Sequence, residues 1–268
     1  MKDGRIALLG AICGDVVGSA REWRRTKKLD FELLPNRARF TDDTVMTCAV
    51  AEWLMNPNSD LVETMQRWGL KYIKSGYGRM FLQWITSDDP KPYNSFGNGS
   101  AMRVSPVGWV AETVEATMAL AKASAEVSHN HPEGVKGAQS VAAAIFMSRT
   151  GHSKEVIQEF IEREFPSYDL RRSLADIRPD YRFDSTCQGS VPESIIAFLE
   201  STDYESAIRN AISLGGDADT MAAISGSIAA AFYKEIPDEI AAGCLNLLSD
   251  DILQCVDNFA QYITKKIT

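Results

Sequence analysis

The chain has 268 residues, of which 45% are hydrophobic and 24% charged, and its net charge is −8 at pH 7. This profile is typical of a soluble globular protein with a sizeable core and argues against an intrinsically disordered chain. The acidic balance also argues against non-specific binding to nucleic acid or anionic membranes, because both attract basic surfaces.

The N-terminal segment and the cysteines indicate the cellular compartment in which the protein is expected. Lys2 and Arg5 followed by an apolar run superficially resemble a signal peptide, but Asp15 interrupts that run. We therefore expect no secretory leader, and no other stretch reaches the roughly 18 apolar residues that a membrane span requires. Five scattered cysteines without CxxC spacing favour buried thiols in a reducing cytoplasm over disulfides or a zinc site.

Helical periodicity runs through nearly the whole chain, whereas alternating β-type segments are scarce. We predict an all-α fold in a single compact multi-helix domain over residues 1–268, because no repeat, low-complexity tract or linker divides the chain. The predicted helices cover residues 5–19, 43–56, 60–74, 112–127, 133–149, 153–164, 191–200, 204–213, 219–233, 238–248 and 250–266. The longer non-helical stretches, which are often functional, are 24–41, 86–100 and 176–190.

The first predicted helix carries Gly10, Gly14 and Gly18 along one face. Such a stripe is consistent with close packing against another helix, and this reading is at least as strong as contact with a ligand. Glu22 follows in the next loop as a lone acid, and by itself it is typical of a solvated side chain.

Two acid-rich helix starts lie far apart in the chain. Thr41, Asp42 and Asp43 open one predicted helix, and Asp217 and Asp219, behind a Gly-Gly turn and before Thr220, open another. Helix capping explains one carboxylate at each start but not two. If the two starts converge, four carboxylates carry a charge of −4 that divalent cations would neutralise. All-oxygen ligands favour hard ions such as Mg²⁺ or Mn²⁺ over zinc.

Two further segments have weaker signals. Gly97, Gly99 and Ser100 precede a short helical run, and such a loop can turn its N–H groups towards a phosphate or diphosphate, although no P-loop signature follows. His129 and His131 are poor metal ligands at this spacing. Capping or a surface position explains both histidines, and hydrogen bonding to a sugar or phosphate is the functional alternative.

Several segments, in this order, resemble the ADP-ribosylglycohydrolase family, which includes the dinitrogen reductase-activating glycohydrolases. The segments are GAICGDVVGSAREW, RFTDDTVMT, YNSFGNGSAMRVSPVGW, SHNHPEGVKGAQ and AISLGGDADTMAAISGSIAAAFY. The resemblance implies an all-helical domain with two Mg²⁺ or Mn²⁺ ions in a central cleft. It also implies hydrolysis of the glycosidic bond between ADP-ribose and a modified acceptor, reversing ADP-ribosylation.

The resemblance also assigns roles to individual residues. The implied metal ligands are Thr41, Asp42, Asp43, Asp217, Asp219 and Thr220. The implied substrate-binding residues are Glu22, Gly97, Asn98, Gly99, Ser100 and His129. Glu22 is matched as a metal ligand or gate on the loop after the first helix. Glu22, Asp42 and Asp219 are the candidates for the base that activates water.

We expect the substrate to be an ADP-ribosylated protein, with arginine as the first candidate acceptor, and ADP-ribose to be released as product. Serine, a nucleic-acid base and a free metabolite stay open as acceptors, so nucleic acid is a partner only if it carries ADP-ribose. We expect a cytoplasmic monomer. The alternative is a non-catalytic ADP-ribose-binding or structural module on the same fold. A terpene synthase or HD-type phosphohydrolase lacks support, because neither DDxxD nor a His-Asp pair is present.

Overall fold

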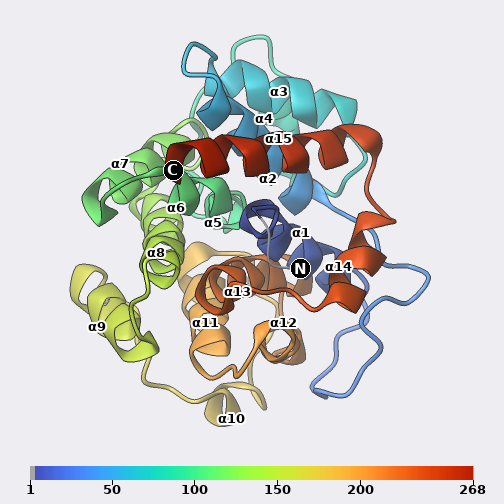
Figure 1. The fold of residues 1–268 in the computed structure, drawn as a ribbon, viewed down its shortest axis with the longest axis vertical. Helices are drawn as coiled ribbons and strands as arrows, with labels where there is room; N and C mark the ends of the chain where they lie inside the picture. Colours follow the sequence, from blue (N-terminus) through green and yellow to red (C-terminus); the bar gives the residue numbers. More distant parts are fainter. Residues whose placement is uncertain (1–3, 268) are drawn as a thin grey trace.

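The computed structural model describes residues 4–267, which form one compact domain of packed helices (Figure 1). Within that range the extended structure is one isolated bridge between Gly97 and Thr186. The helices are α1 (Ile6–Ser19), α2 (Asp42–Met55), α3 (Leu61–Lys71), α4 (Arg79–Ile85), α5 (Gly99–Met102), α6 (Ser105–Val110), α7 (Val114–Glu126), α8 (Pro132–Arg149), α9 (Lys154–Glu164), α10 (Leu174–Ile177), α11 (Cys187–Leu199), α12 (Tyr204–Ser213), α13 (Ala218–Tyr233), α14 (Asp238–Leu245) and α15 (Asp250–Ile267).

The predicted all-α architecture is confirmed, and the differences are local. The prediction omitted α4, α10 and, beyond noting a short helical run, α5 and α6; these helices are four to seven residues long, too short for a periodic pattern. Helix α11 begins at Cys187, four residues before the predicted start, because Thr186 caps it by accepting a hydrogen bond from the Gly189 N–H. Helices α3 and α14 each end three residues earlier than predicted.

The centre of the molecule is an unusually close pair of helices, α1 and α13, which Figure 1 shows surrounded by the other helices. A Cβ atom on Gly14 would lie 2.1 Å from the Ala222 carbonyl oxygen, and one on Gly18 would lie 2.3 Å from the Ala218 oxygen. The glycine stripe of α1 therefore serves helix packing. This contact positions the N-terminus of α13 beside the C-terminal half of α1.

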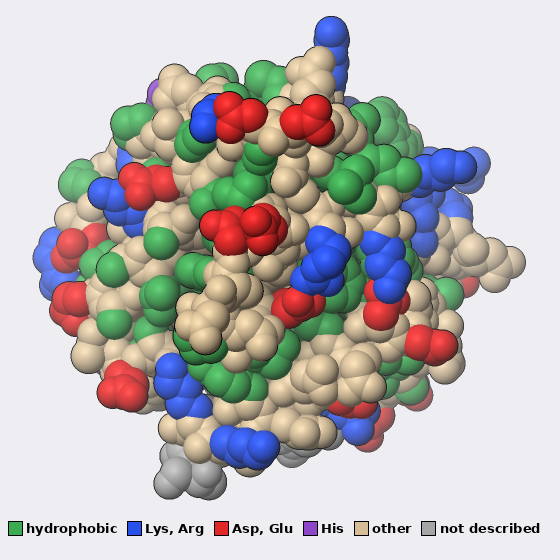
Figure 2. All heavy atoms as spheres, turned by 90° about the horizontal axis from the view of Figure 1, so that it is seen from above, with side chains coloured by type: hydrophobic (Ala, Val, Ile, Leu, Met, Phe, Trp, Pro, Cys, Tyr) green, Lys and Arg blue, Asp and Glu red, His purple; other side chains and the backbone are tan. Residues whose placement is uncertain are grey.

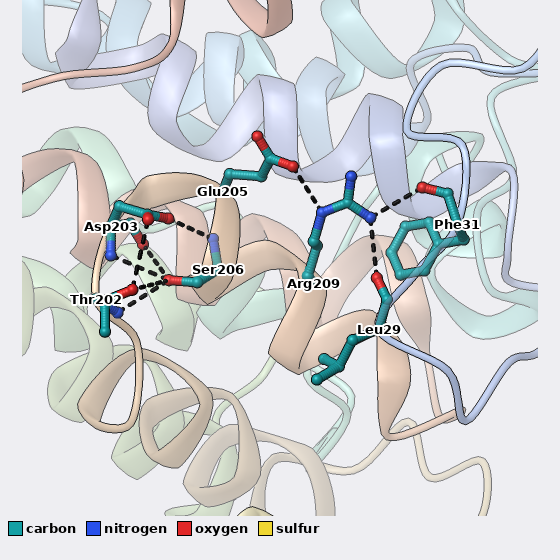
Figure 3. Close-up of polar contacts among 7 residues, drawn as sticks. All are labelled: Leu29, Phe31, Thr202, Asp203, Glu205, Ser206 and Arg209. Carbon is teal, nitrogen blue, oxygen red and sulfur yellow. Dashed lines mark hydrogen bonds and ion pairs between the residues drawn. The ribbon is translucent and has the colours of Figure 1, made fainter.

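The long loop from residue 20 to 41 is fixed to the helices behind it. Arg209 of α12 donates hydrogen bonds to the carbonyl oxygens of Leu29 (2.9 Å) and Phe31 (2.8 Å), and its guanidinium group lies over the Phe31 ring (Figure 3). Glu205 holds the same guanidinium group from one turn earlier, at 2.7 Å. Lys27 adds a second attachment by donating to the Leu214 carbonyl oxygen. The loop that carries Glu22 thus has a defined position.

The surface seen in Figure 2 carries charged side chains of both signs, interspersed rather than gathered into one large patch. Within residues 4–267, no helix is both long and apolar enough to cross a membrane. The five cysteines are free and buried, as predicted.

Candidate active site

A cavity of about 500 Å³ opens between the N-terminal ends of α2 and α13. Its volume is in the range of small-molecule binding sites. The predicted site residues that line it are Glu22, Thr41, Asp42, Asp43, Gly97, Asn98, Gly99, His129, Asp217, Asp219 and Thr220. A second hollow of about 580 Å³ lies between α2, α3 and α15, and none of the predicted site residues lines it.

The first acidic cluster is oriented by a residue of another helix. Thr41 caps α2, with its hydroxyl oxygen accepting from the Asp43 N–H at 3.3 Å. The buried Asp15 carboxylate of α1 accepts from the Thr41 N–H (2.9 Å) and hydroxyl (2.7 Å), and from the Thr44 N–H (3.1 Å) and hydroxyl. Because Asp15 and Thr41 satisfy the free N–H groups of the helix start, Asp42 and Asp43 are left available to the cavity.

The second cluster follows the Gly-Gly turn. Gly215 has a φ of +69°, a left-handed conformation that favours glycine, and this conformation reverses the chain before α13. Asp217 occupies the capping position of α13, yet its side chain makes no capping bond. Its carboxylate instead accepts a 2.8 Å hydrogen bond from the Asn98 amide. Asp217 is therefore turned towards the cavity and away from its own helix.

The two clusters meet across the cavity. The hydroxyl of Thr220, at the start of α13, donates to the Asp43 carboxylate at the start of α2, at 3.3 Å. The two residues are 177 positions apart in the chain. The convergence expected of the two acid-rich helix starts is present in the structure.

Burial, and after it repulsion between neighbouring carboxylates, raises the pKa values of the acids in the cavity. Burial raises the pKa of Asp43 and Asp219 well above the ordinary value, and neighbouring carboxylates raise it further, with Asp15 the largest contributor for Asp43 and Asp217 for Asp219. The pKa of Asp42 rises to about 8, first through burial and then through Asp15. Burial and the Asp217 charge also raise the pKa of Glu22. Without a counter-charge, these acids resist ionisation together.

The donor set fits a hard divalent cation in its chemistry. The candidate ligands are carboxylate and hydroxyl oxygens, and the Oδ1 atom of Asp43 is buried without a hydrogen-bond partner among residues 4–267. Their arrangement is not that of an assembled metal centre, because no three acidic, histidine or cysteine side chains of the described chain are placed to hold one ion. The chemistry therefore supports a cation here, and the binuclear centre stays a proposal.

The glycine-containing loop forms the wall next to His129. Gly97 and Gly99 line the cavity, and a Cβ atom on Gly99 would lie 2.9 Å from Nε2 of His129. Ser100 lies elsewhere: it is fully buried, outside the cavity lining, and its hydroxyl donates to the Gly134 carbonyl oxygen at 2.7 Å. His131 caps α8 by accepting from the Glu133 N–H. Of the two histidines, it is His129 that reaches the cavity.

Exposed apolar side chains are among the residues that line the cavity. Trp23 is 79% exposed there, and Met80 and Phe183 are exposed on other segments of the rim. Aromatic and methionine side chains that remain in contact with water around a cavity often mark a surface for a larger partner.

The sequence did not predict the residues that orient other site residues without being part of the predicted site themselves. In the sequence, Asp15 was interpreted only as an interruption of an apolar run. The signal that would have identified its role is its position in GDVVG, where a carboxylate directly follows a glycine that packs against another helix. Arg103 and Ser128, which lie behind His129, carry no local signal at all. Their significance depends on contacts between segments that are distant in the sequence.

Comparison with known proteins agrees with this geometry. Residues 4–267 match the family model described as ADP-ribosylglycohydrolase. ADP-ribosylhydrolase ARH3 from Bos taurus is 27% identical over an alignment of length 331, gaps included, which covers 93% of this chain and 90% of the relative. ADP-ribosylarginine hydrolase Tri1 from Pseudomonas putida is 24% identical, covering 85% of this chain and 69% of the relative.

A solved structure is similar over the full length. It is titled ADP-ribosylglycohydrolase-related protein complex and superposes with a TM-score of 0.75 at 25% identity, covering 100% of this chain and 99% of that one. The overall helical fold is therefore shared by two proteins that differ at about three quarters of their aligned positions.

Proposed function

Since the chain belongs to the ADP-ribosylglycohydrolase family, we propose that it hydrolyses the bond between ADP-ribose and a modified protein side chain, with arginine as the first candidate. One observation carries the proposal: two acid-rich helix starts face each other across a cavity, with the Thr220 hydroxyl 3.3 Å from the Asp43 carboxylate. The relatives named above include an ADP-ribosylarginine hydrolase, which supports the choice of acceptor.

Two Mg²⁺ or Mn²⁺ ions belong to the proposal. Their ligands would be Thr41, Asp42, Asp43, Asp217, Asp219 and Thr220, which line the cavity. Such ions, when bound, neutralise the carboxylates and orient the hydroxyls of the distal ribose as positive charge develops on that sugar. Asn98 keeps Asp217 pointed into the cavity for this purpose.

Residues of this chain would perform the proton transfer. Water attacks the anomeric carbon of the distal ribose, a C–O bond forms, and the bond from that carbon to the acceptor breaks. The acceptor leaves with the electron pair of the broken bond and takes up a proton from solvent. A carboxylate accepts the proton of that water, and Glu22 is our first candidate because it lines the cavity and is not one of the six proposed metal ligands. Asp42 and Asp219 are the alternatives.

Substrate binding would follow the walls of the cavity. The loop at Gly97 and Gly99, together with His129, lines the cavity and would contact a bound diphosphate or ribose. The acceptor would lie at the mouth, near the exposed Trp23 and Phe183. We further propose that the protein acts in the cytoplasm as a monomer.

The test is release of ADP-ribose from arginine-linked, serine-linked and nucleic-acid-linked substrates, with and without Mg²⁺ or Mn²⁺. We expect metal-dependent release from the arginine-linked substrate. Asp43→Asn and Asp217→Asn should each lower it by about 100-fold or more, the scale of removing a positioned catalytic group. Asp60→Asn, at the exposed start of α3, is the matched control.

Unchanged activity in both cavity variants would overturn the metal assignment. Binding of ADP-ribose by calorimetry with no turnover of any substrate would favour a non-catalytic binding module. A preference for serine-linked or nucleic-acid-linked substrate would correct the acceptor and leave the reaction class in place.

A further inference from the structure

Arg103 is a fully buried charged side chain that is among the residues lining the cavity. No carboxylate pairs with it among the described residues, which is unusual, because a buried charge is normally paired. Its Nη2 atom donates to the Ser124 carbonyl oxygen at 2.8 Å and to the Ser128 hydroxyl oxygen at 3.0 Å. The face of Phe81 lies 5.8 Å from the guanidinium carbon. The fold keeps a buried positive charge that is unfavourable to desolvate, and this charge is hydrogen-bonded to Ser128.

Ser128 connects this cation to His129. The Ser128 hydroxyl oxygen lies 2.8 Å from Nδ1 of His129, and Ser128 is fully buried. Because arginine is a donor only, the Ser128 hydroxyl oxygen accepts the hydrogen bond from Arg103. The hydrogen of the Ser128 hydroxyl group then needs an acceptor. Within the described chain, the acceptor available to that hydrogen is Nδ1 of His129.

The number of available hydrogen-bond donors and acceptors then determines the tautomer of the His129 imidazole ring. If Nδ1 carried the proton, the Ser128 hydroxyl would be left as a buried donor without an acceptor, a penalty that corresponds to a population ratio of about 5- to 150-fold. A neutral imidazole with a free Nδ1 carries its hydrogen on Nε2. Burial, and after it the Arg103 charge, lower the pKa of His129 well below the ordinary value, which is consistent with a neutral ring.

The Nε2 edge of the His129 ring faces the loop that lines the cavity. Nε2 lies against the loop of Gly97 and Gly99, where a Cβ atom would stand 3.7 and 2.9 Å away, respectively, and both glycines and His129 line the cavity. Glycines at these positions leave room for the imidazole edge. An N–H group there can donate to an oxygen of a bound molecule.

We propose that Arg103 is a positioning residue that acts through Ser128 to hold His129 as its Nε2–H tautomer, so that His129 donates a hydrogen bond to ADP-ribose in the cavity. The identity of the ligand rests on the function proposed above, whereas the tautomer follows from the contacts alone. In this role Arg103, which is fully buried at the cavity wall, acts through its hydrogen bond to Ser128.

The tautomer is measurable directly, because the protein has three histidines, and replacement of His129 by Gln identifies its signals. Long-range ¹H–¹⁵N spectra of the full-length, ring-labelled protein should show an unprotonated Nδ1 and a protonated Nε2 for His129, in a ratio of about 5 to 1 or higher. A predominant Nδ1–H form in the unmodified protein would overturn the proposal.

Two pairs of variants separate positioning from packing. Ser128→Ala should reduce the tautomer preference by about 5-fold or more and weaken ADP-ribose binding by calorimetry about 3- to 10-fold. Ser124→Ala, one turn earlier with its hydroxyl bonded to Ala121, should change neither. Arg103→Lys keeps a cationic donor and should preserve more of the preference than the similarly sized, neutral Arg103→Met.

The outcomes distinguish this proposal from the proposed function. The Nε2–H form in a protein that hydrolyses no ADP-ribose substrate would refute the function and leave the positioning intact. Normal hydrolysis with an unchanged tautomer and unchanged affinity in both Ser128→Ala and Arg103→Met would refute the positioning. If the Arg103 variants do not fold, the Ser128→Ala and Ser124→Ala pair decides.

Discussion

The Asp15 carboxylate lies against the Thr41 side chain, 2.7 Å from its hydroxyl oxygen, and so a residue in the middle of α1 completes the cap of α2. This contact joins the central helix pair to the first acidic cluster. The Thr220 hydroxyl and the Asp43 carboxylate then join that cluster to the start of α13. The acidic part of the cavity is therefore positioned by α1, α2 and α13, which are held together by these two buried polar contacts and by the glycine packing of α1.

Removal of Asp15 should be far more costly than removal of an ordinary helix cap. Asp15→Ala leaves the buried N–H groups of Thr41 and Thr44 without an acceptor, at about 1–3 kcal/mol for each group. Asp60→Ala removes an exposed cap of α3, at about 1 kcal/mol. Urea denaturation of both variants measures the difference, and equal losses would contradict the role given to Asp15.

The metal-free protein should become less stable as pH rises. Burial and Asp15 raise the pKa of Asp42 from 3.8 to about 8, so the folded state holds a proton that the unfolded state has already released. Stability is then fully present below the unfolded value and declines as pH rises through the folded value. In a chelator, we expect Tm to fall between about pH 4 and pH 8.

Two additions sharpen the pH experiment. Asp42→Asn should make the decline less steep, and Mg²⁺ should raise Tm most at the alkaline end, where the carboxylates are charged. A Tm that rises over this interval, or a slope that Asp42→Asn leaves unchanged, would show that repulsion among the cavity acids does not govern stability.

A methyl group on the glycine stripe of α1 should separate the central helices. In Gly14→Ala the new atom would meet the Ala222 carbonyl oxygen at 2.1 Å, and backbone cannot move aside easily. Overpacking of this kind costs about 1–3 kcal/mol, so a Tm lower by about 5 °C is expected. Gly78→Ala is the control, since no atom lies within 4 Å of its added Cβ. Matching Tm values for the two variants would disprove the packing argument.

Loss of Arg209 should release the loop that carries Glu22. Arg209→Ala removes the donor to the carbonyl oxygens of Leu29 and Phe31 and the cation over the Phe31 ring. Trypsin should then cleave within residues 21–28 about 5-fold faster, because local opening becomes easier by about 1 kcal/mol. Glu205→Ala leaves both carbonyl bonds in place and serves as the control. Equal cleavage rates in the two variants would exclude Arg209 as the anchor.

Much of this molecule was readable from local sequence. The periodicity of apolar residues predicted the all-α fold and the long helices, because each long helix repeats its pattern over several turns. Paired carboxylates after Thr41 and after Gly216 indicated an oxygen-rich site, since capping uses only one of them. The short helices were not predicted, because four to seven residues do not repeat a pattern.

The sequence by itself determined which residue types stand at the two helix starts, and the tertiary structure decided that these starts share one cavity. It also decided that Ser100 faces α8 rather than the cavity, that Asp15 serves α2, and that Arg103 stands behind His129. The physical reason is range: propensity and capping act within a few residues of the chain, whereas burial, repulsion between carboxylates and the sharing of a hydroxyl hydrogen depend on atoms that only folding brings together.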